Sequence, residues 1–395
     1  MSLTLMSIIT YYPKPTEYQP TRSIRISGSD FKSHDKPISS RIDRNFTEVD
    51  DKIMFKAIRP RTAYEPRKDM GACAHTFGKV LFFVAYIKES METHYRVAQE
   101  SLRCYLRGTD YEVAMVDIMN DPRVVESCSQ HSNVFFRKHC AAAVYLNDTD
   151  WLVVLDADTG IANPNHCIEE WIDDRVDILF YERIFNFEIA SGNYIIKNSE
   201  FSRNFLKKWS DFEHNLPSNW NGADNGALQI LILQMAIPDA FQEYDNCNQI
   251  WHEGQNYETY MNYVTCVKLA LGANRLWPEK LRIYRRAHGW VRDGFMTTDK
   301  FCEVDFMFHG WKNQLVGQEG WESPFNKNLN PEMCGEGDVG WDWRKGKRTT
   351  CDVIKKEIAD FEKSAGQGYP KAAREIPHLR LPDVGICFPN CDKFT

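Results

Sequence analysis

An apolar run that ends in two aspartates constrains the fold of this chain more than any other feature. Residues 151–155 are apolar throughout and have the length of one strand, and Asp156 and Asp158 follow directly. Continuous apolar runs of this length are typical of parallel strands that are covered on both faces. Residues two apart on an extended chain point to the same side. The segment therefore predicts a buried strand with two carboxylates beyond its end.

Strand-length apolar runs alternate with helical patterns before this strand. Residues 80–86 and 111–118 have the pattern of strands, while 94–106 and 135–146 place apolar residues at helical spacing. This alternation indicates a doubly wound α/β sheet, mostly parallel, with helices on both faces. Downstream, strands are predicted at 177–181 and 194–197, helices at 201–212 and 225–236, and a helix followed by irregular, aromatic-rich sequence at 247–325.

Composition divides the chain into three predicted parts. Residues 1–72 are polar and without sustained periodicity, which favours an N-terminal extension or stem. Residues 73–345 carry the α/β pattern. Residues 346–395 form a cysteine-containing tail with one amphipathic stretch at 353–361.

Charge and hydropathy exclude two classes of partner. The net charge is −7, the estimated pI is 5.9 and there is no long basic run, so a nucleic-acid partner is not expected. No run approaches the roughly 18–20 apolar residues that cross a bilayer, so no transmembrane segment is predicted. The N-terminal ten residues lack the basic region of a signal peptide, which leaves the route of targeting open.

The cysteines and two glycosylation triplets favour an oxidising compartment. The chain has 12 cysteines, an even number, and the triplets beginning at Asn45 and Asn147 match the N-glycosylation pattern. We therefore expect the lumen of the secretory pathway (Golgi or ER) or secretion, with a cytoplasmic protein rich in buried thiols as the alternative. Zinc at the close pair Cys387 and Cys391 is not favoured, because no second pair stands at zinc-site spacing.

Asp156 and Asp158 are candidate metal ligands. Ligands of open α/β sheets lie beyond the carboxyl ends of strands, and hard oxygen ligands that leave room for phosphate suit Mg²⁺ or Mn²⁺. The alternative is an Asp-rich loop that caps the next element. Haloacid-dehalogenase-type phosphotransferases also place Asp-x-Asp after a strand, but here Thr159 follows the second aspartate directly and Gly160 stands where their threonine belongs.

Four segments together resemble, in order and spacing, the GT-A-fold transferases of the yeast galactosyl- and mannosyltransferase and plant xylosyltransferase family. They are 155–164, 191–199, 222–228 and 306–312. The region 78–345 also resembles a nematode family of GT-A-like proteins of unknown function. The shared sequence segments are 221–226, 282–293 and 306–311. The resemblance implies a nucleotide-diphospho-sugar transferase fold, with 73–345 as the catalytic domain.

The resemblance implies a metal site of the DXD type. His309 would be the third ligand of a metal ion that Asp156 and Asp158 also bind. The alternative is a histidine enclosed in an aromatic cluster. Lys312, three residues later, could neutralise a departing diphosphate. Lys138, or its neighbour Arg137, lies where related transferases hold a donor-binding lysine, unless that helix face is merely solvated. A second diphosphate candidate, more often a surface run, is the basic cluster of Lys280, Arg282, Arg285 and Arg286.

Candidate sugar and acceptor contacts follow from the same resemblance. Asp224 would lie near the transferred sugar or the acceptor hydroxyl, although as a helix N-cap it would need no functional role. Asn193 could also reach the sugar. Asn225 stands where the family has glutamine, which leaves the sugar preference open. Further contacts are expected from Gly192 and Trp311, and an acceptor platform from Trp220, Trp290 and Trp311, for which core packing is the alternative.

The activity that the resemblance implies is transfer of a hexose or pentose from a nucleoside-diphosphate sugar, with UDP favoured, to a glycan or glycoconjugate. The resembled family retains the anomeric configuration, and Mn²⁺ or Mg²⁺ would be the cofactor. The alternative is a catalytically inactive glycosyltransferase-like protein that binds glycan or nucleotide.

Overall fold

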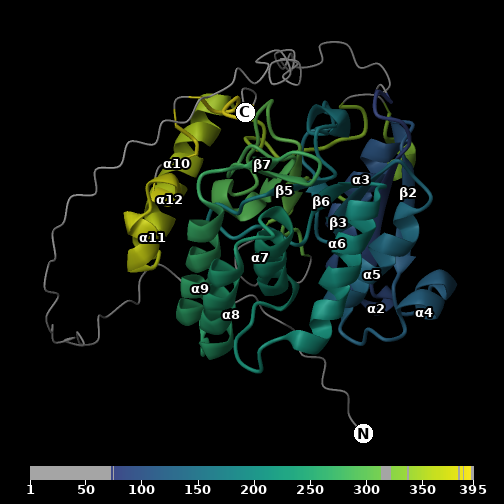
Figure 1. Ribbon diagram of the computed structural model, residues 1–395. Helices are drawn as coiled ribbons and strands as arrows, with labels where there is room; N and C mark the ends of the chain where they lie inside the picture. The colour runs from purple at the N-terminus through teal and green to yellow at the C-terminus, as the bar shows by residue number, and fades with distance from the viewer. Residues whose placement is uncertain are drawn as a thin grey trace, which may run out of the picture. The chain divides into compact units, whose positions relative to one another are not determined.

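A seven-stranded sheet with the order β2-β1-β3-β6-β5-β8-β7 forms the centre of the computed structural model (Figure 1). The structure describes residues 73, 75–312, 322–335, 338–380, 383–385 and 387–392, all within one of two compact units of the chain, Pro60–Thr395. The strands are β1 (Val80–Tyr86), β2 (Glu112–Asp117), β3 (Trp151–Asp156), β5 (Ile178–Tyr181), β6 (Tyr194–Lys197), β7 (Leu276–Trp277) and β8 (Leu281–Tyr284). The predicted extension at 1–72, with Asn45, lies outside the described residues.

The sheet is mixed, although most of its strands run in one direction. β1 is parallel to β2 and β3, and β5 is parallel to β8, whereas β6 is antiparallel to both β3 and β5, and β7 to β8. Five strands therefore share one direction, and β6 and β7 oppose it. The α/β prediction is confirmed, but the reversal of β6 was not predicted. No helix intervenes between β5 and β6, and a parallel pairing would require such a crossover.

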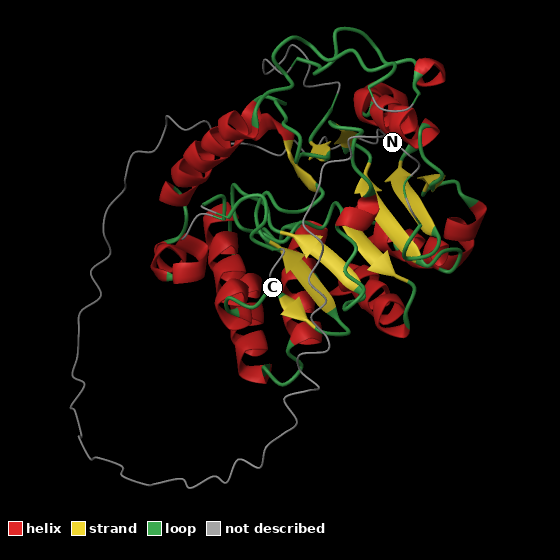
Figure 2. Ribbon diagram, turned by 90° about the horizontal axis from the view of Figure 1, so that it is seen from above, coloured by secondary structure: helices red, strands yellow, loops and turns green. Residues whose placement is uncertain are grey.

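Alternate residues of β3 face two different layers. Leu152 and Val154 belong to a buried cluster formed with α5, α6, α7 and α9, whereas Val153 and Leu155 pack with α3 on the opposite face. Figure 2 shows helices on both sides of the strands. The helices are α2 (Lys88–His94), α3 (Arg96–Arg107), α4 (Pro122–Cys128), α5 (Val134–Leu146), α6 (Glu200–Asp211), α7 (Ala223–Ala236), α8 (Phe241–Glu253), α9 (Tyr257–Leu271), α10 (Cys351–Gln367), α11 (Lys371–Glu375) and α12 (Pro377–Arg380), with 3₁₀ turns η2 (Ile168–Glu170), η3 (Phe212–Asn215), η4 (Gly294–Thr297) and η6 (Pro331–Met333).

A second sheet of three short strands joins the end of β3 to a distant part of the chain. It consists of β4 (Gly160–Ile161), β10 (Met307–His309) and β9 (Val291–Asp293), in that order. Phe308 pairs with Gly160, and His309 pairs with Asp293. A Cβ at Gly160 would lie 2.4 Å from the ring of Trp311, so only glycine leaves room for that ring. The small sheet therefore carries His309 to the end of β3.

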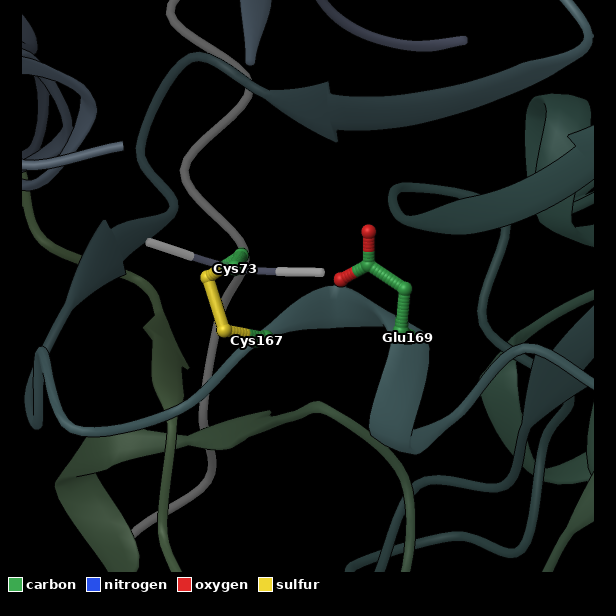
Figure 3. A group of neighbouring side chains, drawn as sticks. All are labelled: Cys73, Cys167 and Glu169. Carbon is green, nitrogen blue, oxygen red and sulfur yellow. A yellow bond between two sulfur atoms is a disulfide. The ribbon is translucent and has the colours of Figure 1, made fainter. Parts of the chain in front are cut away.

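All twelve cysteines form disulfides. The pairs are Cys73–Cys167, Cys104–Cys334, Cys128–Cys140, Cys247–Cys266, Cys302–Cys351 and Cys387–Cys391. Figure 3 shows the first pair beside the carboxylate of Glu169, a grouping that superficially resembles a metal site. Metal ligation by cysteine requires thiolates, and these two sulfur atoms are bonded to each other. The group is therefore a covalent link and not a metal centre.

The C-terminal helices pack on the α/β core. Ile354 and Ile358 of α10 share a buried cluster with Met296 and Cys302, and Tyr369 and Leu379 join the main cluster of the large sheet. The predicted amphipathic stretch at 353–361 is thus part of α10. Within the described part of the chain, no helix is long and apolar enough to cross a membrane.

Candidate functional site

The structure brings Asp156, Asp158 and His309 together at the end of β3. His309 Nε2 lies 3.5 Å from Asp156 Oδ2 and 3.4 Å from Asp158 Oδ1. One ligand atom from each of the three residues lies within 4.8 Å of the others. Two carboxylates and an imidazole in this arrangement can hold a divalent cation of the Mn²⁺ type.

Gly192 makes room for the first carboxylate. A Cβ at this position would lie 2.1 Å from Asp156 Oδ2, closer than any real contact. The neighbouring Asn193 accepts hydrogen bonds from the Asp156 backbone N–H (3.1 Å) and the Thr159 hydroxyl (2.8 Å), and its amide nitrogen is 3.1 Å from the Tyr181 hydroxyl. Asn193 is buried and fully engaged. It fixes the turn that carries the aspartates, and its expected contact with a sugar stays a prediction.

The orientation of His309 is set by an acidic residue that the sequence interpretation missed. Asp293 Oδ1 lies 2.9 Å from His309 Nδ1, and the same oxygen is 2.9 Å from Arg183 Nη2. Burial lowers the pKa of His309, but the carboxylates of Asp158, Asp156 and Asp293 outweigh it and raise the pKa to about 10. A carboxylate behind the ring of a ligating histidine fixes its tautomer and direction. Nothing in the spacing of Asp293 from His309 reveals this pairing before the strands β9 and β10 are known.

Two lysines lie against the aspartates. Lys138 Nζ is 2.9 Å from Asp156 Oδ1 and 3.5 Å from Asp224 Oδ2, and Lys312 Nζ is 3.3 Å from Asp158 Oδ2. Burial lowers the pKa of Lys138, but Asp156 and Asp224 outweigh it and hold the pKa above its ordinary value. The pKa of Lys312 is raised, mainly by Asp158. Of the two neighbours proposed for donor binding, Lys138 faces the site, whereas the guanidinium of Arg137 lies 3.4 Å from the His131 carbonyl.

Burial raises the pKa of Asp156, but the neighbouring cations lower it by more. Lys138 and His309 outweigh the desolvation and hold the pKa of Asp156 well below its usual range. The site is therefore a network of alternating charges at neutral pH. The carboxylates can attract a metal ion, and the lysines beside them can attract an anionic ligand that binds together with that ion.

Asp224 is directed into the same network and does not cap its helix. The residue that caps α7 is Gly222, in the left-handed conformation (φ 71°), and Asn221 Oδ1 accepts a hydrogen bond from the Ala223 backbone N–H at 2.8 Å. Asp224 Oδ2 lies 3.1 Å from Nε2 of His139, a buried residue that the sequence interpretation also missed. The ring of His139 stacks on Trp209 with centroids 3.5 Å apart, and burial lowers its pKa to about 4. The N-cap interpretation of Asp224 is therefore wrong.

Other predicted contacts separate into buried and exposed residues. Trp311 and Trp290 are fully buried, and the Trp311 indole donates to Asp299 Oδ1 at 2.9 Å, so neither can form an acceptor platform. Trp220 is 51% exposed and its ring lies edge-on to that of Tyr257, which is 42% exposed. Asn225 Oδ1 accepts a hydrogen bond from the Ser191 backbone N–H at 3.0 Å.

The basic side chains at 280–286 are engaged by other parts of the protein, mostly by the C-terminal segment. Arg282 pairs with Asp173, Arg285 with Asp392, and Arg286 with both Asp383 and Glu362. Lys280 donates to the Ala236 carbonyl at 3.2 Å. Since its guanidinium groups are engaged in ion pairs, this second diphosphate candidate is wrong.

Comparison with known proteins gives one family and a set of similar solved structures, of which two are described here. The family model described as "Protein of unknown function, DUF273" matches residues 102–322. A comparison with curated proteins gives no match. A glycosyltransferase involved in glycosylation of the major capsid of PBCV-1 is 11% identical, with 58% of this chain and 93% of that chain covered and a TM-score of 0.37. The mannosyltransferase PcManGT of Pyrobaculum calidifontis, in complex with GDP-Man and Mn²⁺, is 13% identical, with 52% and 73% covered and a TM-score of 0.25.

Proposed function

The chain belongs to the DUF273 family, and we propose that it is a metal-dependent glycosyltransferase that uses a nucleoside-diphosphate sugar. One observation carries the proposal: Asp156, Asp158 and His309 converge at the end of β3, with Lys138 and Lys312 against the two carboxylates. This is a site for a divalent cation together with a polyanion. The four segments that resemble GT-A transferases support the same activity.

The residues present fit a Mn²⁺ or Mg²⁺ ion. Oxygen ligands from Asp156 and Asp158 suit both ions, and the imidazole of His309 favours Mn²⁺. Asp293 Oδ1 accepts a hydrogen bond from Nδ1–H of His309, which leaves Nε2 directed at the aspartates. When bound, the ion would neutralise diphosphate oxygens and so make the nucleotide a better leaving group.

The lysines supply the remaining positive charge. Lys312 is part-exposed and three residues from His309, so its ammonium can turn from Asp158 towards a diphosphate oxygen. Lys138 is buried between Asp156 and Asp224 and is held there by both. We assign Lys312 to the leaving diphosphate and Lys138 to the alignment of Asp156, because fixed charges beside developing charge lower the barrier to bond cleavage.

Asp224 is the acidic residue that we assign to the sugar. Its carboxylate is linked through Lys138 to Asp156, and it is held from the other side by the neutral ring of His139. In this position it would orient a sugar hydroxyl or the acceptor. We propose a UDP-linked hexose or pentose as donor and transfer with retention of configuration, as the resemblance implies.

The exposed pair of Trp220 and Tyr257 is the proposed contact for a glycan acceptor. Trp220 precedes Asp224 by four residues, on the loop that leads into α7. Tyr257 lies on α9, and its hydroxyl is 3.4 Å from the Asn186 side chain. Aromatic rings with one exposed face pack well against the apolar faces of sugars.

We also propose that the protein resides in the secretory pathway. Six disulfides support an oxidising compartment, and Asn147, the acceptor of its glycosylation triplet, is exposed at the end of α5. A mass that does not change when the native protein is treated with a glycosidase would count against this location.

The decisive experiment is donor hydrolysis over a panel of nucleotide sugars with Mn²⁺. Wild type should release nucleoside diphosphate from one class of donor, and chelation or Asp158→Ala should abolish the release. Asp239→Ala, which removes an exposed carboxylate at the loop after α7, is the control and should leave the rate unchanged. If the folded wild type hydrolyses no donor but binds nucleotide or glycan, the protein is a binding protein without turnover.

A further inference from the structure

A second group of potential metal ligands lies between the start of α5 and the end of α6. It consists of His131, from the loop before α5, with Glu213 and His214 of η3. One ligand atom from each residue lies within 4.8 Å of the others. In the described part of the chain, the ion pairs of His131 are with Asp211 and Glu213, and those around Asp156 and Asp158 are with Lys138, His309 and Lys312, so the two groups are separate.

Glu213 is held rigidly and in its ionised form. Its Oε1 accepts from the backbone N–H groups of Ser132 (2.9 Å) and Asn133 (2.8 Å) and from the Ser132 hydroxyl (2.8 Å). Burial raises the pKa of Glu213, but these donors outweigh it and hold the pKa below its ordinary value. Its other oxygen, Oε2, lies 3.2 Å from His131 Nδ1. The carboxylate therefore both anchors the start of α5 and fixes the His131 ring.

The second ring nitrogen of His131, Nε2, is buried. The side chain is 1% exposed, and among the described residues Nε2 has no hydrogen-bond partner. The carboxylate of Asp211 is the nearest charge, with Oδ1 at 3.8 Å, and the ring of His214 stacks on that of His131 with centroids 5.7 Å apart. A buried polar atom without a partner is uncommon and calls for a bound species or a functional reason.

The hydrogen bond at Nδ1 gives Nε2 the form that a metal requires. When Nδ1–H donates to a carboxylate, Nε2 carries the lone pair, which is the carboxylate–histidine arrangement found behind many metal ligands. His214 and Asp211 are part-exposed or exposed and can close on an ion at small cost. The donors are therefore the two imidazoles and Oδ1 of Asp211, whose other oxygen pairs with Lys207 at 2.8 Å, while Glu213 orients His131. Such a donor set suits Zn²⁺ better than Mg²⁺ or Mn²⁺.

We propose that His131 and His214, with Glu213 and Asp211 beside them, bind a structural Zn²⁺ that joins the start of α5 to the end of α6. The two helices pack against each other and supply Lys138 and His139 on one side and Trp209, on which His139 stacks, on the other. A link at this end of the pair would hold both helices in register. This site does not depend on the proposed transferase activity.

The test uses the tag-free full-length protein with Asp158→Ala, which removes a ligand of the first site. Zn²⁺ is titrated in competition with a chromogenic chelator. The Asp158→Ala protein should retain one Zn²⁺ equivalent. Adding His214→Ala should weaken the affinity for Zn²⁺ at least tenfold, because loss of even a partner behind a metal ligand typically costs about 10–100-fold. His214 is exposed, so its removal leaves the fold intact. His252→Ala, a second exposed histidine near a helix end, is the matched control and should change nothing.

Thermal melting gives an independent readout. Zn²⁺ should raise the melting temperature of the Asp158→Ala protein but not that of Asp158→Ala with His214→Ala, because only a folded site binds the ion. Absence of a Zn²⁺ equivalent in the Asp158→Ala protein would overturn the proposal. Equal affinity with and without His214 would overturn it as well, since the ion would then lie elsewhere.

Discussion

Gly192 and Asp156 are in such close contact that the position of the first metal ligand depends on the absence of a side chain. The carboxylate occupies the space that a Cβ at residue 192 would need, with Asp156 Oδ2 only 2.1 Å from that point. The φ of Gly192 is not in the left-handed region, so its role is steric and not conformational. The Asp156 carboxylate therefore fits only because residue 192, two positions before β6, has no side chain.

Gly192→Ala should inactivate the protein without unfolding it. The methyl group would push the Asp156 carboxylate away from His309, and a displacement of about 1 Å at a reacting centre costs roughly 100-fold in rate. Overpacking should cost only about 1–3 kcal/mol of stability. Donor hydrolysis and thermal melting measure the two effects. Gly366→Ala, in α10 where a Cβ meets nothing closer than 4.0 Å, is the control.

Asp293 should control metal affinity through His309. Asp293→Ala removes the acceptor that orients the ring, and loss of such a partner typically weakens metal binding by about 10–100-fold. Asp293→Asn keeps an oxygen for Nδ1–H and should weaken Mn²⁺ binding much less. Titration of Mn²⁺ followed by electron paramagnetic resonance distinguishes them. Equal affinities of the alanine variant and wild type would show that His309 needs no orienting partner.

Lys312 should act on the leaving diphosphate. Lys312→Gln should lower kcat for donor hydrolysis by about 100-fold, the usual effect of removing one group that stabilises developing charge. Lys312→Arg retains the charge and should recover part of the rate. A loss that appears only in KM would assign the lysine to donor binding in the ground state and not to the departure of the diphosphate.

Trp220 should affect the acceptor and not the donor. Trp220→Ala should raise the acceptor KM about tenfold, since an exposed aromatic contact is worth on the order of 1.4 kcal/mol. Donor hydrolysis without acceptor should be unchanged. Phe241→Ala removes an aromatic side chain that is 69% exposed at the start of α8 and is the matched control. A change in donor hydrolysis on Trp220→Ala would contradict the assignment.

His139 should make the fold sensitive to mild acid. Its pKa is about 4 in the folded protein and its ordinary value is 6.5, so between these values the unfolded chain binds more protons. Stability contributed by the neutral ring is therefore present above pH 6.5 and is lost as the pH falls towards 4. From pH 6.5 to 5 the loss from this residue should be about 1–2 kcal/mol. In His139→Gln, urea unfolding should show a correspondingly shallower pH dependence, whatever the other histidines contribute.

The sequence predicted the elements well because each is encoded locally. All nine predicted strands and helices between residues 80 and 236 are observed with ends within two residues of those expected. Asp156, Asp158 and the apolar strand before them form one local pattern, and His309 was found through the resemblance. Strands β4, β9 and β10 were missed because each is only two or three residues long and depends on pairing with distant segments.

Residues that act through partners were not predictable in the same way. Asp293, Arg183 and His139 have no motif of their own, and their roles exist only because the fold brings them to His309 and Asp224. Other predictions were wrong because they relied on residue type alone. Trp311 has a residue type suited to a sugar contact, but the folded chain buries it. Burial and side-chain partners are properties of the whole chain, and short patterns do not contain them.

The metal ligands are synthesised at very different times, because the small sheet joins segments that are far apart in the sequence. Asp158 and His309 are 151 positions apart (309 − 158), and β10 reaches β4 only after most of the α/β core has been synthesised. A nascent chain that ends before β10 would carry both aspartates and Lys138 but not His309. Since chains fold from the N-terminus during synthesis, metal capture would be a late event that only a nearly complete chain can perform.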